Sequence, residues 1–226
     1  MNQLRERSHY PISVDCVIFG YIAGELKVVL VQRKKPPFVG MWAIPGGFME
    51  NDETVEETAF RELKEETGIE NVYIEQFHVF SERGRDPRGP TITVAFFALI
   101  RAEHCKLFAS GDASDAKWWP VNEIPKLAFD HNKIYDKALE TLRRAIQYKP
   151  LVFELLPREF TLFELQNLYQ QIFNLILDKR NFRKKIQKMV FISATGKSVK
   201  GLRHRPAELY RYNSKLYAKF EKDYLF

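Results

Sequence analysis

The segment from Thr54 to Gly68 encodes a helix whose start and end are both specified by the sequence. Thr54, followed three residues later by Glu57, is the pattern of a capping box, in which each side chain accepts a hydrogen bond from the other residue's backbone N–H. Gly68 is suited to the left-handed conformation that ends many helices. A helix fixed at both ends presents one defined face to the core, and the residues on that face therefore restrict the fold.

The face that this helix turns to the core carries carboxylates as well as apolar side chains. At about 100° per residue, two apolar residues and two glutamates fall in one sector, namely Val55, Ala59, Glu62 and Glu66. Glu65 borders this sector. Carboxylates packed there without a partner would repel each other and lose hydration. A divalent cation removes both penalties, and hard oxygen ligands select magnesium or manganese. A solvated acidic face is the alternative, but the mixed apolar stripe argues against it.

Short apolar segments separated by turn residues surround this helix in the sequence and predict the strands of a sheet. They are Val14–Phe19, Leu26–Val31, Trp42–Ile44, Asn71–Ser81, Thr91–Ile100 and a short strand that starts at Lys117. The run Thr91–Ile100 is nearly continuous, which predicts a strand covered on both faces. A second helix is predicted for Asn132–Tyr148, because apolar residues recur there at three- and four-residue spacing.

Charge is divided unevenly along the chain. Residues 1–150 carry 20 basic and 22 acidic residues, whereas residues 151–226 carry 15 and 7. A helix end and this change of composition coincide at Lys149-Pro150, which predicts one domain over residues 1–150 and a second over residues 151–226. The excess of positive charge in the second domain predicts a polyanionic partner, with a basic surface that has no partner as the alternative.

Other features of the composition restrict the class of protein. Hydrophobic residues make up 45% of the chain and charged residues 28%, which is ordinary for a globular protein. No apolar run approaches the roughly 18 residues of a membrane span, and nothing resembles a signal peptide. We therefore expect a cytoplasmic protein without a membrane partner. Cys16 and Cys105 are far apart in the sequence and are expected to be buried free thiols.

The residues around the first predicted helix resemble the Nudix box at every defined position. The pattern consists of Gly47, Glu53 and the run Arg61–Ile69 at the spacing of that family. Trp42 and the pair Pro45-Gly46 before it are also typical of the family. The resemblance implies an α/β/α sandwich with a mixed sheet. It also implies hydrolysis of a nucleoside diphosphate linked to another group, with magnesium and water.

Position in the box implies the role of each residue. The resemblance implies that the metal is bound by three glutamates and one backbone carbonyl, those of Glu62, Glu65, Glu66 and Gly47. Arg61 and Glu53 are implied to brace the loop instead of touching the metal. The chemistry is consistent with this assignment, because a bound metal neutralises a pyrophosphate and activates water.

Residues outside the box are expected to supply the general base and the contacts to the substrate. Related enzymes often take the base from an acidic loop, for which Asp112 and Asp115 are the candidates, and surface acids without a role are the alternative. Four residues are candidates for binding phosphates or stacking on a base, namely Arg33, Trp42, Arg83 and Arg85. His131 is a candidate ligand contact, but we favour a turn histidine with satisfied hydrogen bonds.

The segment after Pro150 has the order helix, turn, basic helix and basic ribbon, which is typical of a winged helix-turn-helix. The helices are predicted at Thr161–Phe173 and Lys179–Met189, and the ribbon pairs Val190–Ala194 with Glu208–Tyr212. Phosphate contacts would supply most of the affinity for DNA. The DNA contacts are expected from the outward basic residues of the second helix and the ribbon loop, namely Lys179, Arg180, Arg183, Lys184, Lys188, Lys197, Lys200, Arg203 and Arg205.

Motifs spread over nearly the whole chain resemble the Nudix-related transcriptional regulators of NAD metabolism and sugar utilisation. They are Asp86–Gly89, Leu127–His131, Phe153–Pro157, Asp178–Arg183 and Arg205–Tyr210. The resemblance implies a Nudix domain that binds a nucleotide or sugar effector such as ADP-ribose, a winged helix that binds double-stranded operator DNA, and a homodimer. Many of these regulators have a degraded box, whereas this chain retains every defined position.

Three hypotheses therefore remain open. The first is a magnesium-dependent Nudix hydrolase of an ADP-ribose-like compound that is coupled to a DNA-binding regulator module. The second is a regulator whose Nudix domain only senses its ligand. The third is an ADP-ribose pyrophosphatase whose basic tail serves dimerisation. The intact box favours the first and third hypotheses, and the basic helix and ribbon favour the first and second, so we favour the first.

Overall fold

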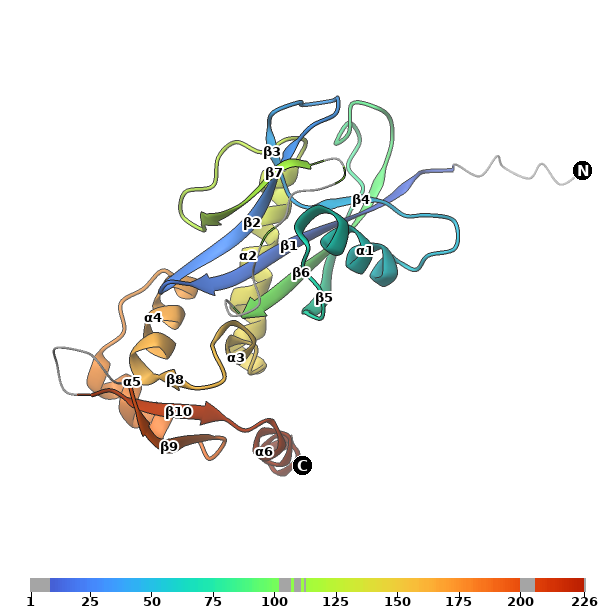
Figure 1. The fold of residues 1–226 in the computed structure, drawn as a ribbon. Helices are drawn as coiled ribbons and strands as arrows, with labels where there is room; N and C mark the ends of the chain where they lie inside the picture. Colours follow the sequence, from blue (N-terminus) through green and yellow to red (C-terminus); the bar gives the residue numbers. More distant parts are fainter. Residues whose placement is uncertain (1–8, 102–106, 108–110, 112, 200–205, 226) are drawn as a thin grey trace, which may run out of the picture. The chain divides into compact units, whose positions relative to one another are not determined.

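A computed structural model describes residues 9–101, 107, 111, 113–199 and 206–225 of the chain (Figure 1). It divides into two compact units. The first consists of Met1–Phe19, Lys27–Ile100 and His104–Leu142, and the second of Gly20–Leu26, Arg101–Glu103 and Arg143–Phe226. The domain boundary at residue 150 stays a prediction. Five residues singled out in the sequence lie outside the described ranges, namely Cys105, Asp112, Lys200, Arg203 and Arg205.

The first unit is built on a seven-stranded sheet with the order β3-β2-β1-β6-β5, in which β4 also pairs with β1 and β7 with β2. The strands are β1 Ile12–Ile22, β2 Glu25–Arg33, β3 Trp42–Ala43, β4 Gly46–Phe48, β5 Tyr73–Phe80, β6 Ile92–Arg101 and β7 Ala113–Pro120. The starts of β1 and β6 lie side by side, because the hydroxyls of Ser13 and Thr93 are 2.6 Å apart. The arrows of these two strands point the same way in Figure 1, which makes the sheet mixed, as predicted.

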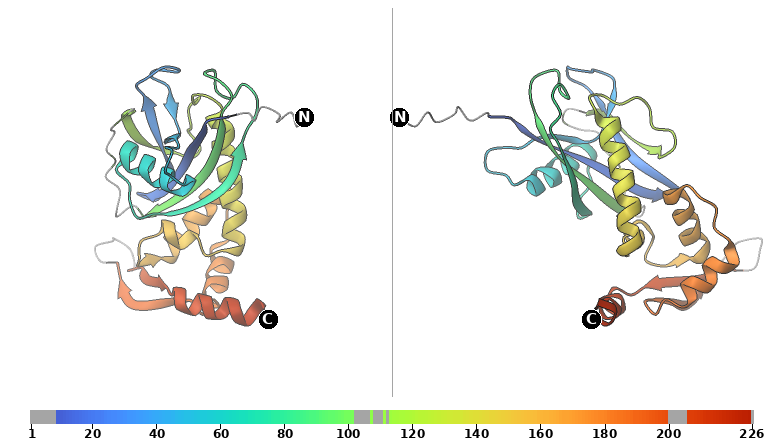
Figure 2. Two further views of the ribbon diagram at one scale, coloured as in Figure 1. Left: turned by 90° about the vertical axis from the view of Figure 1, so that its right-hand side faces the viewer. Right: turned by 180° about the vertical axis from the view of Figure 1, so that it is seen from behind.

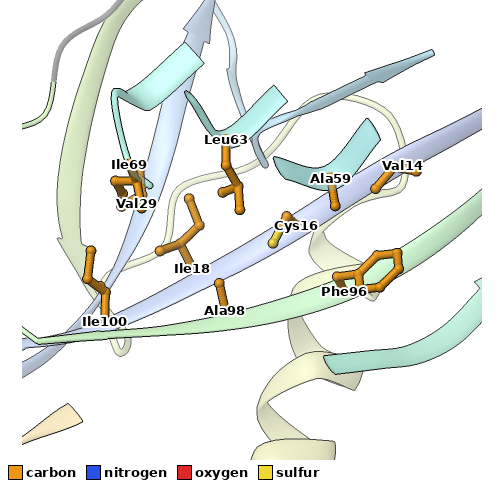
Figure 3. Close-up of a cluster of buried hydrophobic side chains, with 10 residues drawn as sticks. All are labelled: Val14, Cys16, Ile18, Val29, Ala59, Leu63, Ile69, Phe96, Ala98 and Ile100. Carbon is orange, nitrogen blue, oxygen red and sulfur yellow. The ribbon is translucent and has the colours of Figure 1, made fainter. Parts of the chain in front are cut away.

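Helices α1 (Val55–Thr67) and α2 (His131–Tyr148) cover opposite faces of this sheet (Figure 2). Successive side chains of a strand point to opposite faces. Cys16 and Ile18 of β1 therefore belong to the cluster that includes Leu63 of α1 (Figure 3). Phe19 points the other way, and its ring centre lies 6.4 Å from that of Tyr135 in α2. The arrangement confirms the predicted α/β/α sandwich.

Both ends of α1 are as the sequence predicts. Glu57 donates its backbone N–H to the Thr54 hydroxyl, and the Glu57 carboxylate accepts the Thr54 N–H at 2.8 Å. At the other end, Gly68 has a φ of 73° and donates its N–H to the carbonyl of Lys64. A side chain would strain the backbone at this φ, so glycine is favoured where the helix ends.

The second unit contains the predicted winged helix. Its elements are α3 Val152–Leu155, β8 Phe160–Thr161, α4 Leu162–Phe173, α5 Lys179–Gln187, β9 Ile192–Ser198, β10 Glu208–Tyr212 and α6 Ser214–Leu225. The strands form a sheet of order β8-β10-β9. The predicted ribbon is correct in its pairing, since Ala194 lies opposite Tyr210, but β9 extends further toward the ribbon loop than predicted. Helices α3 and α6 and strand β8 were not predicted from the sequence.

Helix α4 holds the turn that joins β1 to β2, which belongs to the second unit. The Asn167 amide donates to the Tyr21 hydroxyl and to the Gly24 carbonyl, each at 2.8 Å. The Gln171 amide donates to the same Gly24 carbonyl at 2.7 Å and accepts the Leu26 N–H at 2.7 Å. Both hydrogen-bonding groups of an amide are thus used at this turn, which fixes its position on α4.

Cys16 is a free thiol that is 2% exposed, as expected, and burial raises its pKa. In the part of the chain that the structure describes, no helix is long and apolar enough to cross a membrane.

Candidate functional site

A cleft in the first unit opens where the starts of β1 and β6 meet β4 and the loop before α2. Its enclosed space is about 70 Å³. The lining residues come from segments far apart in the sequence and include Ser13, Asp15, Arg33, Gly46, Gly47, Phe48, Glu66, Arg85, Asp86, Arg88, Thr93, Phe129 and His131. Charged groups of both signs and two phenylalanine rings thus surround one small space.

The glutamates of α1 are positioned by the backbone of β4. The Gly46 N–H donates to Glu66 at 3.0 Å, and Glu66 is 8% exposed. A Cβ on Gly47 would lie 2.1 Å from a carboxylate oxygen of Glu62, so only glycine allows this approach. Glu65 differs, because its side chain is 56% exposed and lies 3.5 Å from Arg61. The structure therefore places two of the three predicted metal ligands beside the Gly46–Gly47 backbone.

Arg61 ties the loop before α1 to the helix itself. Its guanidinium donates to both oxygens of Glu53, at 2.6 and 2.9 Å, and to the carbonyl of Phe48 at 3.0 Å. It also donates to Glu62 at 2.7 Å. Hydrogen bonds from Arg61 lower the pKa of Glu53 to about 2. This geometry suits the bracing role that the resemblance implies for the pair.

The oxygen ligands near Gly47 suit a magnesium ion. No group of three or more His, Cys, Asp or Glu side chains within the described ranges is arranged to hold a metal. Glu62, Glu66 and the Gly47 carbonyl would supply two carboxylates and a backbone oxygen. Magnesium commonly takes one or two carboxylates and completes its shell with water and phosphate oxygens. Burial raises the pKa of Glu62, a penalty that a cation beside its carboxylate would offset.

Arg85 lies at the floor of the cleft with only 6% of its side chain exposed. It donates to both carboxylate oxygens of Asp130, at 3.0 and 2.9 Å, and to the Thr93 hydroxyl. A second carboxylate, that of Asp15, lies 3.8 Å away. Such a bidentate pair fixes the geometry of both partners. Most donors of Arg85 are therefore engaged within the protein.

His131 and Asp15 form a second buried pair beside this network. The ring Nδ1 of His131 accepts the Ile44 N–H at 2.9 Å, and Nε2 lies 3.7 Å from Asp15. Burial lowers the pKa of His131 to about 3, so the ring is neutral and carries its proton on Nε2, toward Asp15. Burial raises the pKa of Asp15 to about 7. His131 thus has the satisfied hydrogen bond that we favoured, and it also lines the cleft.

Arginines and aromatic rings alternate at the cleft's mouth. The guanidinium of Arg88 lies 5.0 Å from the ring centre of Phe48 and 5.4 Å from that of Phe129. Arg33 lies 4.8 Å from the same Phe129 ring, and Phe38 packs against that ring edge-on. Arginine and phenylalanine at these distances attract each other, which orders the side chains at the mouth of the cleft.

Other predicted contact residues lie elsewhere. Trp42, Arg83 and Asp115 are not among the described residues that line the cleft. Trp42 packs edge-on against Trp119 at 5.3 Å, and Arg83 is exposed in its loop. Asp115 is paired with Lys117 at 2.8 Å. Several residues of the cleft were not predicted as site residues from the sequence, namely Asp15, Phe48, Asp86, Arg88 and Phe129. A lone acid inside an apolar strand was the signal for Asp15.

The basic helix α5 presents its charges to solvent. Ile186 is buried, Phe182 and Met189 are half-buried, and the predicted DNA-binding residues Lys179, Arg180, Arg183, Lys184 and Lys188 are all exposed. On β9, Lys197 forms an ion pair with Glu159 at 3.1 Å. Helix α5 thus has the amphipathic form expected of a recognition helix.

The fold and these sites define a Nudix domain joined to a DNA-binding winged helix. Residues 9–142 match the NUDIX domain family, and residues 152–212 match the NrtR DNA-binding winged helix domain. The chain therefore belongs to the Nudix family, in the branch that carries an NrtR-type winged helix.

Known relatives share this organisation. The "ADPR responsive transcriptional repressor NtrR" of Acinetobacter baylyi is 36% identical, over 92% of this chain and 85% of its own. Shewanella oneidensis NrtR, solved with a 27mer DNA, is 35% identical with a TM-score of 0.78, over 92% of this chain and 95% of that one. The NUDIX domain of that protein, solved with ADP ribose, is 39% identical with a TM-score of 0.55, over 62% and 94%. An ADP-ribose pyrophosphatase of Methanocaldococcus jannaschii is 43% identical, over 56% and 71%.

Arg85→Met is expected to lower the free energy of unfolding of the first unit by about 3–5 kcal/mol, because Asp130 and Asp15 lose their buried partner. The loss should shrink as the pH falls below about 7, where Asp15 binds a proton and needs no cation. Urea unfolding followed by tryptophan fluorescence reports on this unit, since Trp42, Trp118 and Trp119 all lie in it. Arg83→Met is the exposed control, and Arg85→Met with Asp130→Asn should recover part of the loss. Identical midpoints for wild type and Arg85→Met would contradict the expectation.

Proposed function

We propose that this protein is a transcriptional regulator whose Nudix domain binds an ADP-ribose-type ligand and whose winged helix binds operator DNA. The observation that carries the proposal is the continuous similarity, over nine-tenths of the chain, to a repressor described as ADP-ribose responsive and to a protein solved with DNA. The cleft and helix α5 supply the two chemistries that such a protein needs. A homodimer and a cytoplasmic location, where operator DNA is found, are part of the proposal.

The cleft suits a ligand with a pyrophosphate and a flat base. The enclosed space of about 70 Å³ has room for a phosphate group but is far smaller than the roughly 300 Å³ or more of whole ligand pockets. The pyrophosphate would therefore lie inside, near the Gly46–Gly47 backbone and Arg33. The base would lie at the mouth, where Phe48, Arg88 and Phe129 offer stacking surfaces.

Hydrolysis of the same ligand is a second proposed function, favoured by the carboxylates at β4. Glu62 and Glu66 would hold a magnesium or manganese ion with the Gly47 carbonyl, and Glu65 would join when a ligand is bound. When present, the metal neutralises phosphate charge and activates water. Arg61 orients Glu62 through the hydrogen bond at 2.7 Å. Asp112 and Asp115 remain proposals for the general base.

The first unit and the DNA-binding unit share continuous strands, and this supports coupling between the two ligands. Strand β1 contributes Ser13 and Asp15 to the cleft, and the turn after it is held by Asn167 and Gln171 of α4. A ligand changes DNA affinity only if it binds two arrangements of the protein unequally. Movement of β1 on ligand binding would reach α4 through hydrogen bonds that leave the turn little freedom.

The cleft and the winged helix are consistent with a regulator that only senses its ligand, but they argue against a pyrophosphatase with a dimerising tail. A regulator that only senses its ligand would have the same cleft and winged helix, so only an activity measurement separates it from a regulator that also hydrolyses the ligand. A pyrophosphatase with a dimerising tail does not account for the match of residues 152–212 to a DNA-binding domain or for the exposed basic face of α5.

Glu66→Gln is expected to lower the rate of ADP-ribose hydrolysis in magnesium by about a hundredfold or more, because one metal ligand is lost. Glutamine can still accept the Gly46 N–H, so the fold should persist. Phosphate release after phosphatase treatment measures the rate, and Glu56→Gln, exposed on the same helix, is the control. If the wild-type protein binds ADP-ribose but cleaves no nucleoside diphosphate compound, the enzyme hypothesis is excluded and the hypothesis of a ligand-sensing regulator remains.

Arg180→Ala with Arg183→Ala is expected to weaken binding to the DNA upstream of the gene, because α5 should enter the major groove. Each phosphate contact that is lost should reduce the slope of log affinity against log salt by about one unit. Fluorescence anisotropy over a salt series measures both quantities. Lys215→Ala with Lys219→Ala removes the same charge from α6 and is the matched control. Equal loss in both double variants would show that charge alone, not helix α5, determines binding.

ADP-ribose is expected to change operator affinity by roughly five- to 150-fold, the usual range of coupling between two sites. Reciprocity requires that operator DNA change ADP-ribose affinity by the same factor. Paired titrations of each ligand with and without the other, with calcium in place of magnesium to suppress turnover, measure both factors. Unchanged affinities in both directions would mean that this ligand does not regulate DNA binding.

A further inference from the structure

A second polar cleft, distinct from the ligand cleft of the first unit, lies within the second unit and has a volume of about 400 Å³. Three arginines line it, namely Arg101 at the end of β6, Arg158 before β8 and Arg211 on β10. Glu154 is the acidic side chain among its described lining residues. Three arginines around one small space repel each other unless negative charge lies between them.

Two of these arginines have donors that the protein leaves unused. Arg101 donates through one Nη to the Phe153 carbonyl at 3.2 Å and to Glu154 at 3.1 Å. Its Nε is buried and has no hydrogen-bond partner in the described part of the protein. A buried charged donor without a partner costs free energy. Arg158 is exposed and makes no hydrogen bond or ion pair with any described residue.

The charged residues around the cleft have an excess of positive charge that a dianion would balance. Arg211 donates to Glu159 at 2.7 Å, and Lys197 is paired with the same carboxylate. Hydrogen bonds from Lys197 and Arg211 lower the pKa of Glu159, which therefore stays ionised. The four basic residues of this cluster thus face two carboxylates, those of Glu154 and Glu159. A phosphate monoester carries close to two negative charges above its second pKa of about 6.

The cleft is also lined by two aromatic rings and by the first residue of a helix, which suits an anion that carries an organic group. Phe153 and Tyr212 stack with ring centres 4.2 Å apart and planes within 5°, and both line the cleft. Ser214, the first residue of the 12-residue helix α6, lies at its edge. Backbone N–H groups in the first turn of a helix favour a bound anion.

The cleft does not lie on the face that α5 offers to DNA. On β10, Tyr210 lines a separate groove together with Arg183 and Gln187 of α5. The next residue, Arg211, lines the three-arginine cleft, in which no described residue of α5 takes part. DNA held by α5 would therefore not fill this cleft, and a small ligand is the better match.

We propose that this three-arginine cleft is a binding site for a small phosphate-bearing molecule, held by Arg101, Arg158 and Arg211. Inorganic phosphate or a phosphomonoester supplies acceptor oxygens for the second Nη of Arg101, which makes no hydrogen bond with a described residue, and for the Arg158 guanidinium. The site goes beyond the proposed function, because it is separate from the Nudix cleft and from the basic face of α5. Its occupancy would tie the wing strand β10 to Arg101 at the end of β6.

The test is a titration of the full-length protein, labelled with ¹⁵N-arginine, with inorganic phosphate at constant ionic strength. The side-chain Nε–H signals of arginine report on each site separately. We expect a saturable shift of the Arg101 signal. Arg158→Gln and Arg211→Gln should each weaken phosphate binding by about tenfold or more, as expected for the loss of a charge-assisted hydrogen bond. Arg33 and Arg88 report independently on phosphate in the first unit.

Arg180→Gln, an exposed arginine of α5, is the matched control and should leave phosphate affinity unchanged. Operator affinity separates the two sources of phosphate. Arg158→Gln should bind DNA as wild type does, whereas Arg180→Gln should not. The proposal is wrong if Arg101 shows no saturable shift, or if the Arg158 and Arg211 variants bind phosphate as wild type does. A loss of DNA binding in Arg158→Gln without phosphate binding to wild type would assign the arginines to the DNA backbone, and would also overturn it.

Discussion

The geometry of the Nudix site depends on the guanidinium of Arg61. It joins three parts of the chain, because it donates to Glu53 in the loop, to the Phe48 carbonyl at the end of β4 and to Glu62 on α1. Glu62 can lie against Gly47 only while α1 and β4 keep this spacing. The orientation of Glu62, a predicted metal ligand, is thus set by an ion pair with Arg61, and surrounding residues orient the ligands of many metal sites in this way.

Features governed by local rules were predictable from the sequence. The capping box at Thr54 and the glycine after α1 depend on residues within a few positions of each other, so their spacing alone identifies them. The inward orientation of Glu62 and Glu66 on α1 was predictable, because helical periodicity placed both residues among apolar ones. Periodicity did not settle the orientation of Glu65, which borders the apolar stripe. Its side chain is 56% exposed in the structure.

The cleft outside the box was not predictable in the same way. Arg85 and Asp130 are 45 residues apart, and no periodicity relates them. Their pairing follows from the parallel arrangement of β1 and β6 and from the position of the loop before α2. The same holds for the turn after β1, which is held by Asn167 and Gln171 more than 140 residues later. Hydrogen bonds of this kind are specified by the complete fold.

Charged side chains are paired in the Nudix cleft but exposed on helix α5, and this difference follows from the ligand that each part binds. In the Nudix cleft, Arg85 is matched by Asp130 and Arg88 by Asp86, so that the fixed dipoles and ion pairs orient a ligand at short range. A buried cation without such a partner would destabilise the fold. Helix α5 instead keeps its cations in solvent, where they lose little hydration and attract phosphates over about a Debye length, roughly 8 Å at physiological salt. Short-range matching selects one small molecule, whereas exposed excess charge favours a long polyanion of almost any sequence. Specificity for an operator must then come from base contacts by α5, within a surface whose affinity is mainly electrostatic.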